Sequence, residues 1–419
     1  MRHFMEKDGE MFAEDVALSE IAAKVGTPVY VYSAATFARH YDVFAKGFEG
    51  TDALIAYSVK ANSNLAILSL LAKRGAGADV VSGGELTRAL RAGISPDKIV
   101  FSGVGKTRDE MRLALGAGIY QFNVESAAEL DALSETAADT DMTAPIAFRV
   151  NPDVAAGGHE KISTGKKENK FGIAWDDARA LYARAASLPG IKIQGVDVHI
   201  GSQITQLDPY ARTIDKIGGL IKNLRADGHT IETFDLGGGL GIPYGDGGQQ
   251  PPPPADYAAM VLGATKDLDV RLLFEPGRMI AGNSGVLLSR VIYTKPGETR
   301  NFLIVDAAMN DLIRPALYGA YHDVEPVKSG ANETVSYDIV GPICESGDTF
   351  AVQRDLPKLA ADDLVVFHSA GAYGAVQASQ YNTRPLVPEV LVSGDEYAII
   401  RKRPDYDDML SSETVPKFI

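Results

Sequence analysis

Residues 53–93 read ALIAYSVKANSNLAILSLLAKRGAGADVVSGGELTRALRAG. Two apolar strands are predicted in this segment, at Ala53–Val59 and at Ala78–Val81. A helix is predicted between them, because Asn64 is a favourable N-cap and Gly75 is a favourable stop. A strand, a helix and a second strand in this order form the repeating unit of proteins with a parallel sheet.

The same alternation continues to about Met279. The predicted strands are short, apolar and eight in number: Ala53–Val59, Ala78–Val81, Lys98–Ser102, Tyr120–Val124, Ile146–Val150, Ile191–Ile200, Thr233–Leu236 and Val270–Glu275. Capping boxes are predicted at Thr107 with Glu110 and at Ser126 with Glu129, where two of the intervening helices begin. Eight consecutive units predict an α/β fold with a closed (β/α)8 barrel. An open, doubly wound sheet is the alternative.

From Met279 on, the pattern changes to β-strands separated by Gly, Pro and Asp, with few helices. The predicted strands of this part are Val286–Tyr293, Asn301–Asp306, Val335–Val340, Thr349–Val352, Asp363–Phe367, Glu389–Ser393 and Glu396–Arg401. The strand-like segment Thr27–Tyr32 precedes the barrel, and we assign it to the same domain. We therefore expect the barrel over residues 34–278 and a discontinuous, mostly β domain over residues 1–33 and 279–419.

The composition limits the possible partners. The chain has 419 residues, with 41 Lys and Arg against 55 Asp and Glu, which gives a net charge of −14. A phosphate backbone repels such a surface, and no basic patch stands out, so we expect no nucleic-acid partner. No stretch approaches the roughly 18 uncharged apolar residues of a membrane span, so we expect no membrane partner. The single cysteine and the N-terminus without an apolar leader favour a cytoplasmic protein.

Two long loops interrupt the barrel pattern. Asn151–Lys170 is polar and rich in glycine and follows the fifth strand; loops of this length are often lids over an active site. Gly245–Pro254 follows the seventh strand and ends in four consecutive prolines. The simplest interpretation of this second loop is a stiff surface insertion.

Residues with useful chemistry gather at the predicted strand ends, where (β/α)8 barrels place their active sites. Lys60 ends the first strand and is either a surface lysine or an amine that forms a Schiff base. Gly237–Gly239 follow the seventh strand and form either a flexible turn or a phosphate-binding loop. Glu275 and Arg278 flank a Pro-Gly turn after the eighth strand. They form either a local ion pair or a site for a cationic ring nitrogen and an anion.

Two further groups of residues add to this pattern. His199 follows the sixth strand with Ser202 close by, so an imidazole can stack on an aromatic cofactor while a hydroxyl binds phosphate. In the β domain Cys344 adjoins Glu345, and Tyr373 lies in a glycine-rich segment downstream, although a single cysteine is more often a small buried residue. A Schiff-base lysine, a phosphate loop, a carboxylate for a ring nitrogen and a stacking imidazole together fit pyridoxal 5′-phosphate.

On these motifs the chain resembles the fold-type III pyridoxal-phosphate-dependent decarboxylases over nearly its whole length. The matching motifs are, in order, Tyr57–Asn62, His199–Gln203, Gly237–Gly239, Glu275–Arg278, Arg314–Tyr318, Cys344–Asp348 and Gly371–Gly374. Seven motifs in the same order are far more specific than any one of them. Val59 departs from the commonest pattern, which often has alanine at this position, and we expect this to alter only the packing.

The resemblance implies a role for each matching residue. The residues implied to be catalytic are Lys60, Cys344, His199 and Glu275. Those implied to bind the cofactor are Lys60, Asp79, His199, Ser202, Gly238, Gly239, Glu275, Gly277 and Tyr373. Those implied to bind substrate are Arg278, Arg314, Tyr318, Glu345 and Tyr373. In the family, the residues matching Cys344 and Glu345 reach the partner subunit's site, so a homodimer with shared active sites is implied; a metal ion is not.

The resemblance is strongest to the branch of this family that converts meso-2,6-diaminopimelate to lysine and CO2, the last step of lysine biosynthesis. The far end of that substrate carries a carboxylate and an ammonium, to which Arg278, Arg314 and Glu345 are chemically matched. The alternatives are a related decarboxylase acting on ornithine, arginine or carboxynorspermidine, an alanine racemase, or a non-catalytic homologue. Glu275 disfavours a racemase, which benefits from a weaker electron sink, and Lys60 with Cys344 disfavours a non-catalytic protein. The sequence does not assign the donor of the proton that returns to the α-carbon, and Cys344 and Lys60 are the candidates.

Overall fold

The computed structural model describes residues 3–155, 170–245, 247–330 and 333–419. The chain forms two compact units. The barrel unit comprises Phe37–Pro243 and Gln249–Ile280, and the β unit comprises Met1–Thr36, Tyr244–Gly248 and Ala281–Ile419. These bounds differ from the expected ones chiefly at Tyr244–Gly248, because the Tyr244 ring packs against Arg314 and His322 of the β unit.

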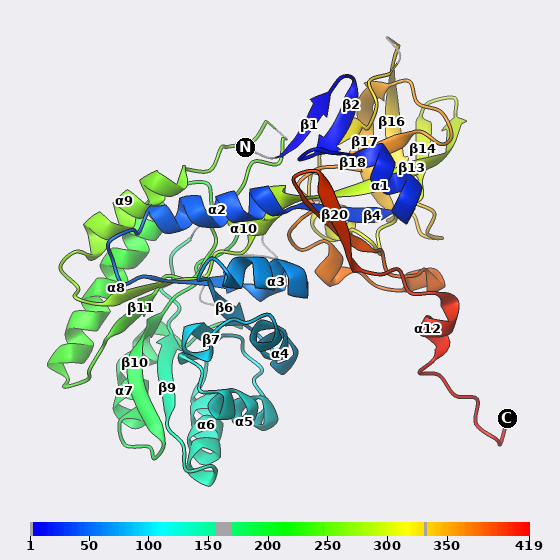
Figure 1. Ribbon diagram of the computed structural model, residues 1–419. Helices are drawn as coiled ribbons and strands as arrows, with labels where there is room; N and C mark the ends of the chain where they lie inside the picture. Colours follow the sequence, from blue (N-terminus) through cyan, green and yellow to red (C-terminus); the bar gives the residue numbers. More distant parts are fainter. Residues whose placement is uncertain (1–2, 156–169, 246, 331–332) are drawn as a thin grey trace. The chain divides into compact units, whose positions relative to one another are not determined.

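The barrel unit contains a closed barrel of parallel strands in the order β10-β11-β12-β5-β6-β7-β8-β9 (Figure 1). The strands are β5 (Leu54–Ser58), β6 (Gly77–Val80), β7 (Ile99–Phe101), β8 (Gln121–Val124), β9 (Ala144–Arg149), β10 (Ile191–Asp197), β11 (Thr233–Asp235) and β12 (Arg271–Phe274). The barrel closes where β12 pairs with β5, with Leu273 opposite Leu54 and Phe274 opposite Ile55. Each strand corresponds to one predicted strand. The barrel prediction is therefore confirmed, and the open-sheet alternative is wrong.

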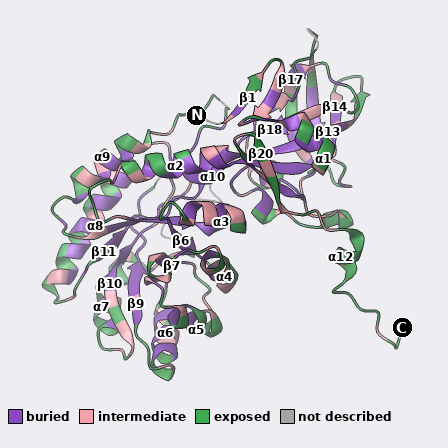
Figure 2. Ribbon diagram, viewed as in Figure 1, coloured by how far each residue is buried: buried purple, intermediate pink, exposed green. Residues whose placement is uncertain are grey.

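Helices follow the strands and surround the barrel (Figure 1). They are α2 (Ala34–Lys46), α3 (Leu65–Ala72), α4 (Gly83–Arg91), α5 (Arg108–Ala117), α6 (Ala127–Asp139), α7 (Ala178–Ala185), α8 (Asp208–Ala226), α9 (Pro254–Thr265) and the short α10 (Arg278–Ala281). The strands are buried, whereas the helices expose one face (Figure 2), as expected for a parallel sheet covered by helices. In the described part of the chain, no helix has the length and apolar composition that crossing a bilayer requires.

The helix starts follow local side-chain chemistry. Thr107 and Glu110 form both hydrogen bonds of the predicted capping box at the start of α5. At the start of α6 only half of the predicted box forms: Ser126 accepts the Glu129 N–H, but the Glu129 carboxylate accepts the N–H of Glu125 instead of that of Ser126. The second capping box was therefore only partly correct, because a competing backbone donor lies within reach of Glu129.

The structure describes only one of the two predicted loops in most of its length. Most of the expected lid Asn151–Lys170 lies outside the described residues, so its role stays a prediction. The proline run Pro251–Pro254 leads directly into α9, and Pro254 is the first residue of that helix. A proline at this position costs no helical hydrogen bond, because the first N–H groups of a helix have no partner within it. The last proline of the run therefore starts a helix of the barrel wall.

The β unit contains two sheets. A three-stranded sheet consists of β1 (Phe4–Lys7), β2 (Glu10–Ala13) and β3 (Val16–Ala17). The strands of the larger sheet are β4 (Val29–Ser33), β13 (Gly285–Pro296), β14 (Asn301–Val305), β15 (Val324–Pro326), β16 (Thr334–Val340), β17 (Thr349–Pro357), β18 (Leu364–Phe367), β19 (Glu389–Ser393) and β20 (Glu396–Arg401). Because β4 lies between β13 and β19, the prediction that the N-terminal strand joins the β domain is confirmed. The short strands β1, β2, β3 and β15 were not predicted.

Among its described residues the β unit also has three short α-helices: α1 (Leu18–Val25), α11 (Arg314–Tyr318) and α12 (Tyr406–Leu410). Leu18 and Ile21 of α1 pack with Val29, Val286 and Val390 in one apolar core, which joins the N-terminal helix to the larger sheet. Alternation along the strands supplies these residues, since every second side chain faces the same side of a sheet.

Candidate active site

Lys60 lies just beyond the end of β5, in the short 3₁₀ turn Val59–Ala61. Its Nζ atom lies 2.5 Å from Oδ2 of Asp79, on the neighbouring strand β6. The parallel pairing places Ser58 opposite Asp79, so a lysine shortly after Ser58 reaches this carboxylate. Asp79 is fully buried, and its Oδ1 atom has no hydrogen-bond partner among the described residues. An amine and an unsatisfied carboxylate oxygen therefore adjoin each other at the carboxyl end of the barrel.

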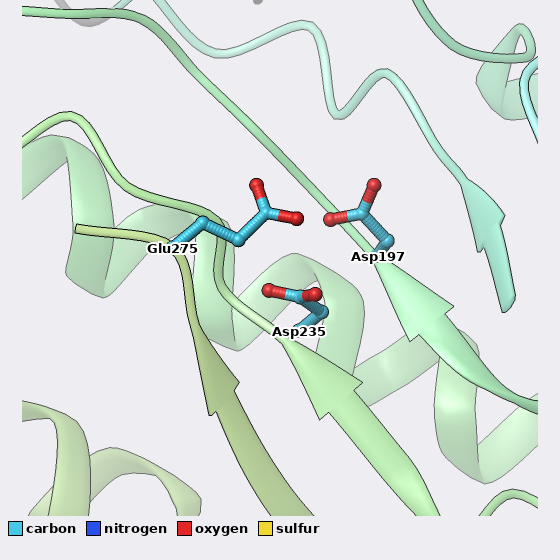
Figure 3. A group of neighbouring side chains, drawn as sticks. All are labelled: Asp197, Asp235 and Glu275. Atoms are coloured by element: carbon cyan, nitrogen blue, oxygen red, sulfur yellow. The ribbon is translucent and has the colours of Figure 1, made fainter. Parts of the chain in front are cut away.

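Three more carboxylates meet beside this pair. Asp197 ends β10, Asp235 ends β11, and Glu275 directly follows β12. The three strands are neighbours in the barrel, and Figure 3 shows the three side chains pointing toward one another. One oxygen atom of each lies within 4.8 Å of the others, and all three residues are buried. Such a cluster is suited to a cationic group, either a protonated ring nitrogen or a metal ion.

Polar neighbours hold this cluster in place. Oε1 of Glu275 accepts hydrogen bonds from Ser102 Oγ at 3.0 Å and from Asn123 Nδ2 at 3.2 Å. Oδ1 of Asp235 accepts the backbone N–H of Gly237 at 2.9 Å, which fixes the start of the glycine loop. Neutral donors from β8, from the residue after β7 and from the glycine loop therefore orient these carboxylates.

Burial raises the pKa of all three carboxyl groups. The pKa of Glu275 lies well above its ordinary value, first because of burial and then because of the negative charges of Asp235, Asp79 and Asp197. Burial likewise raises the pKa of Asp235 to about 6 and that of Asp197 well above its usual range. Because like charges at this distance resist simultaneous ionisation, each of these carboxyl groups is protonated more readily than it would be alone, and a cation within the cluster would relieve the repulsion.

His199 follows β10 and lies beside the glycine loop. The pKa of its imidazole is well below the ordinary value, first because of burial and then because of the positive charges of Arg149 and Lys60. The Gly238 N–H donates to its Nδ1 atom at 3.2 Å. Since Nδ1 accepts this hydrogen bond, the neutral ring carries its proton on Nε2. The site therefore holds an uncharged imidazole in one tautomer.

The glycine loop after β11 requires glycine for steric reasons. A Cβ atom on Gly238 would collide with the carbonyl oxygen of Glu275, and one on Gly239 would lie 2.5 Å from the carbonyl oxygen of Gly201. Gly239 also has a φ of +98°, which L-residues rarely adopt. The loop therefore runs close to the backbone of two other strand ends, which leaves no room for a side chain at Gly238 or Gly239.

Ser202 and Arg278 contact each other directly. The Nε and Nη2 atoms of Arg278 lie 3.3 Å and 3.0 Å from Oγ of Ser202. Arg278 is buried at the start of α10, directly after the turn that contains Gly277. The two residues were predicted to bind different groups, phosphate and substrate carboxylate, and the structure places them in direct contact.

The β unit carries the other predicted residues. Arg314 is buried at the start of α11, where its Cζ atom lies over the Tyr244 ring, 5.0 Å from the centroid, and its Nη1 atom lies 2.9 Å from Nε2 of His322. Tyr318 ends the same helix, and its hydroxyl lies 3.4 Å from Nε2 of Gln377.

The loop after β16 presents a thiol and a carboxylate to solvent. Cys344 and Glu345 are both exposed, and a hydrogen bond from Tyr381 to Glu345 raises the pKa of the Tyr381 hydroxyl. The side chain of Asn382 accepts the Cys344 N–H at 3.2 Å. Tyr373 adopts a φ of +57°, a left-handed conformation that is strained for a bulky residue and that clusters at functional sites.

Comparison with known proteins identifies the family. Residues 34–282 match the model of the pyridoxal-dependent decarboxylase pyridoxal-binding domain, and this range covers the barrel. The chain is 51% identical over 413 residues to the diaminopimelate decarboxylase of Zymomonas mobilis, covering 98% of each chain. The chain belongs to the diaminopimelate decarboxylase family. The Pseudomonas aeruginosa member is likewise 51% identical, over 99% of each chain.

Solved structures of this family share the fold. The diaminopimelate decarboxylase of M. jannaschii in complex with L-lysine has a TM-score of 0.94 and 38% identity, with complete coverage of both chains. The Helicobacter pylori enzyme in complex with L-lysine has a TM-score of 0.90 and 40% identity, covering 94% of this chain and 98% of that one. The fold class inferred from the sequence, a (β/α)8 barrel with a mostly β domain, is thereby confirmed.

The barrel residues fit the pyridoxal cofactor that the family model names. An aldehyde needs an amine, which Lys60 supplies beside the unsatisfied oxygen of Asp79. A cationic ring nitrogen needs a negative environment, which the cluster around Glu275 supplies. A phosphate needs donors and close backbone approach, for which Ser202 and the loop at Gly238 are suited.

The barrel site also contains two carboxylates that the sequence analysis missed. Asp197 and Asp235 were assigned to strands but not to the site, although a carboxylate within an apolar strand is itself a signal. On the β unit, His322 and Tyr244 contact Arg314 and carried no motif at all. The roles of the residues that were named stay proposals, and the structure adds their geometry.

Proposed function

We propose that this chain decarboxylates meso-2,6-diaminopimelate to L-lysine and CO2 with pyridoxal 5′-phosphate, as a carboxy-lyase at the last step of lysine biosynthesis. The observation that carries this function is the identity of about half of all residues, end to end, with curated diaminopimelate decarboxylases. The related structures with bound L-lysine support an amino-acid substrate of this size. The alternatives ornithine, arginine and carboxynorspermidine have no comparable support.

The barrel residues have distinct proposed tasks toward the cofactor. When bound, pyridoxal phosphate accepts the electron pair that remains on the α-carbon after CO2 leaves. Lys60 would hold the cofactor covalently, with Asp79 as its charged partner. Glu275 would keep the ring nitrogen protonated, because the cluster already strongly favours a positive charge at this place. The neutral imidazole of His199 would lie against the ring face and add no positive charge.

The phosphate and the substrate would use the remaining residues. Ser202, the loop amides of Gly238, Gly239 and Gly277, and the hydroxyl of Tyr373 are proposed to bind the phosphate. The Gly238 N–H donates to His199 in the structure, so its proposed bond to the phosphate would replace that hydrogen bond. Arg278, Arg314, Tyr318, Glu345 and Tyr373 are proposed to bind the substrate. A planar guanidinium recognises a carboxylate with two parallel hydrogen bonds, so buried arginines are suited to a dicarboxylic substrate.

Release of CO2 tests the function. The holoenzyme is given carboxyl-labelled meso-diaminopimelate, and both labelled CO2 and lysine are measured, with ornithine and arginine as comparison substrates. We expect diaminopimelate to be strongly preferred and Lys60→Ala to abolish turnover. Lys73→Ala is the matched control, because Lys73 is an exposed lysine at the end of α3. Equal turnover of ornithine would contradict the assignment.

We further propose that the active enzyme is a homodimer in which Cys344 and Glu345 of one subunit complete the partner subunit's site. The exposure of both side chains on the β unit supports this arrangement. In that case Cys344, along with Lys60, is a candidate for returning the proton to the α-carbon. The single cysteine of the chain, which excludes an intrachain disulfide, supports our proposal of a cytoplasmic location.

Mixed dimers test the shared site. Lys60→Ala and Cys344→Ala subunits are each expected to be nearly inactive alone. If Cys344 serves the partner's Lys60, subunit exchange produces dimers with one intact site, and activity returns in part. If each subunit uses its own Cys344, no mixed dimer has an intact site and activity stays absent, which would contradict the shared arrangement.

A further inference from the structure

His322 and Arg314 form a buried pair that no motif of the sequence indicated. Arg314 begins α11, and His322 lies between this helix and β15. The Nη1 atom of Arg314 is 2.9 Å from Nε2 of His322, and both residues are less than a tenth exposed. The Tyr244 ring contacts both, with its centroid 5.0 Å from the Arg314 Cζ atom and its plane nearly perpendicular to the imidazole.

The hydrogen bonds of His322 determine where its proton lies. Its Nδ1 atom is 2.8 Å from the carbonyl oxygen of His368. A carbonyl oxygen only accepts, so Nδ1 carries the proton. A guanidinium only donates, so Nε2 must offer its lone pair to Arg314. Both contacts are satisfied together only by a neutral imidazole protonated on Nδ1.

The backbone around His322 is fixed by the sheet. β15 pairs with β18 in antiparallel register, with Val324 opposite Phe367, and the next residue after β18 is His368. The N–H of His368 donates to the carbonyl oxygen of Asp323 at 2.8 Å. The imidazole is therefore held by a strand ladder, a more rigid support than a surface loop.

This support restricts Arg314 in two ways. Contact with the face of the Tyr244 ring limits where the guanidinium can move, and the hydrogen bond to His322 limits its rotation. Bidentate binding requires the guanidinium to be coplanar with the carboxylate and turned so that two N–H groups face its two oxygens. The contact with His322 uses one N–H of the five that a guanidinium carries.

We propose that His322 is a positioning residue that orients the Arg314 guanidinium for the substrate's distal carboxylate, and that it does so as the neutral Nδ1–H tautomer. This inference rests on the proposed function, in which Arg314 binds that carboxylate. It adds a specificity-determining residue that is not expected to touch the substrate.

Two variants separate positioning from simple packing. His322→Leu removes the acceptor for Arg314, whereas His322→Gln keeps an acceptor and a donor. We expect His322→Leu to raise the KM for meso-diaminopimelate roughly ten- to hundred-fold, the effect of losing one hydrogen bond to a charged group. The kcat should change much less, and His322→Gln should restore most of the loss. His40→Gln is the matched control, since His40 is a buried histidine whose Nδ1 atom also contacts a backbone carbonyl oxygen.

A double-mutant cycle with Arg314→Ala shows whether the effect passes through the arginine. In the Arg314→Ala background, His322→Leu should cause no further rise in KM. An additive rise would overturn the inference. If Arg314→Ala leaves the KM unchanged, the binding role of Arg314 fails and the positioning role fails with it. If Arg314→Ala raises the KM and His322→Leu does not, only the inference about His322 fails. Absence of CO2 release by the unmodified enzyme would instead identify a failure of the proposed function.

Nitrogen-15 NMR of the holoenzyme tests the tautomer without relying on activity. Histidine-labelled enzyme, with the His322→Gln variant used for assignment, should show a protonated Nδ1 and an unprotonated Nε2 for His322. A doubly protonated ring or the opposite tautomer would overturn the inference. This measurement tests the proposed tautomer of His322 even if the His322→Leu variant fails to fold.

Discussion

The Nζ atom of Lys60 and the Oδ2 atom of Asp79 lie 2.5 Å apart, on adjacent strand ends of the barrel. The two residues are 19 positions apart in the sequence, and the β5–β6 register brings them together. The pair couples the proposed covalent anchor of the cofactor to a carboxylate that is fully buried.

Asp79→Asn should weaken cofactor binding while preserving the fold. Asparagine keeps the shape and one acceptor but removes the negative charge opposite Lys60. Because hydrogen bonds to charged groups contribute about 1.5–3 kcal/mol, we expect the apparent affinity for the cofactor to fall roughly ten- to hundred-fold. Titration of the apoenzyme with cofactor, followed in the visible spectrum, measures this. Asp97→Asn removes an exposed carboxylate and should bind the cofactor normally.

Glu275→Gln should reduce turnover with little change in the fold. Glutamine keeps the hydrogen bonds with Ser102 and Asn123 but removes the charge that would keep the ring nitrogen protonated. An opposite charge within about 4–6 Å shifts a pKa by roughly 1–3 units, so loss of the Glu275 charge should lower the pKa of the ring nitrogen by about this amount. We therefore expect kcat to fall about ten- to thousand-fold. Steady-state kinetics of the purified variant measure the loss, and Glu275→Asp should recover part of it. A fully active Glu275→Gln enzyme is incompatible with the proposed role.

The pH dependence of apoenzyme stability should reveal the carboxylate cluster. Burial raises the pKa of Asp235 to about 6 in the folded state, above the ordinary value of 3.8. The folded state therefore binds a proton more tightly than the unfolded chain. The resulting stabilisation is complete below pH 3.8 and disappears as the pH rises through about 6.

We therefore expect the Tm of the unmodified apoenzyme to fall relative to that of Asp235→Asn as the pH rises from 4 to 7. Because one pKa unit corresponds to 1.36 kcal/mol, the difference in the free energy of unfolding is on the order of 2 kcal/mol. Thermal unfolding of both proteins across this window measures it. If the Tm values of the two proteins change in parallel with pH, Asp235 has its ordinary pKa in the folded state. That result would contradict the expected effect of burial on this carboxyl group.

Gly238→Ala and Gly263→Ala should change stability in opposite directions. A Cβ atom at Gly238 would collide with the Glu275 carbonyl oxygen, so the strand end must shift. We expect a loss on the order of 1–3 kcal/mol and weaker cofactor binding. Gly263 lies in α9 with nothing within 4 Å of an added Cβ, so alanine there should stabilise the protein by about 0.5–1 kcal/mol. Thermal unfolding and cofactor titration of both variants check this. Equal Tm values would contradict the steric argument.

Local patterns in the sequence were sufficient for the barrel. Each strand carries an apolar run, and helix signals such as the Thr107–Glu110 box separate the runs. Because parallel strands in a barrel direct all their carboxyl ends to one rim, residues after different strands, such as Lys60 and Glu275, were expected to share a site. Chemistry at strand ends can therefore be inferred from the order of elements alone.

The sequence could not show which side chains meet at that rim. Asp197 and Asp235 lie in apolar strands, and only the β10–β11 register makes them neighbours. His322 reaches Arg314 in the tautomer it needs only because β15 pairs with β18 and brings the His368 carbonyl oxygen to its ring. Periodicity and chain order specify the barrel and the residues offered at its rim, because these depend on local hydrophobic pattern. Register, burial and protonation depend on atoms far apart in the chain, so only the tertiary structure decided them.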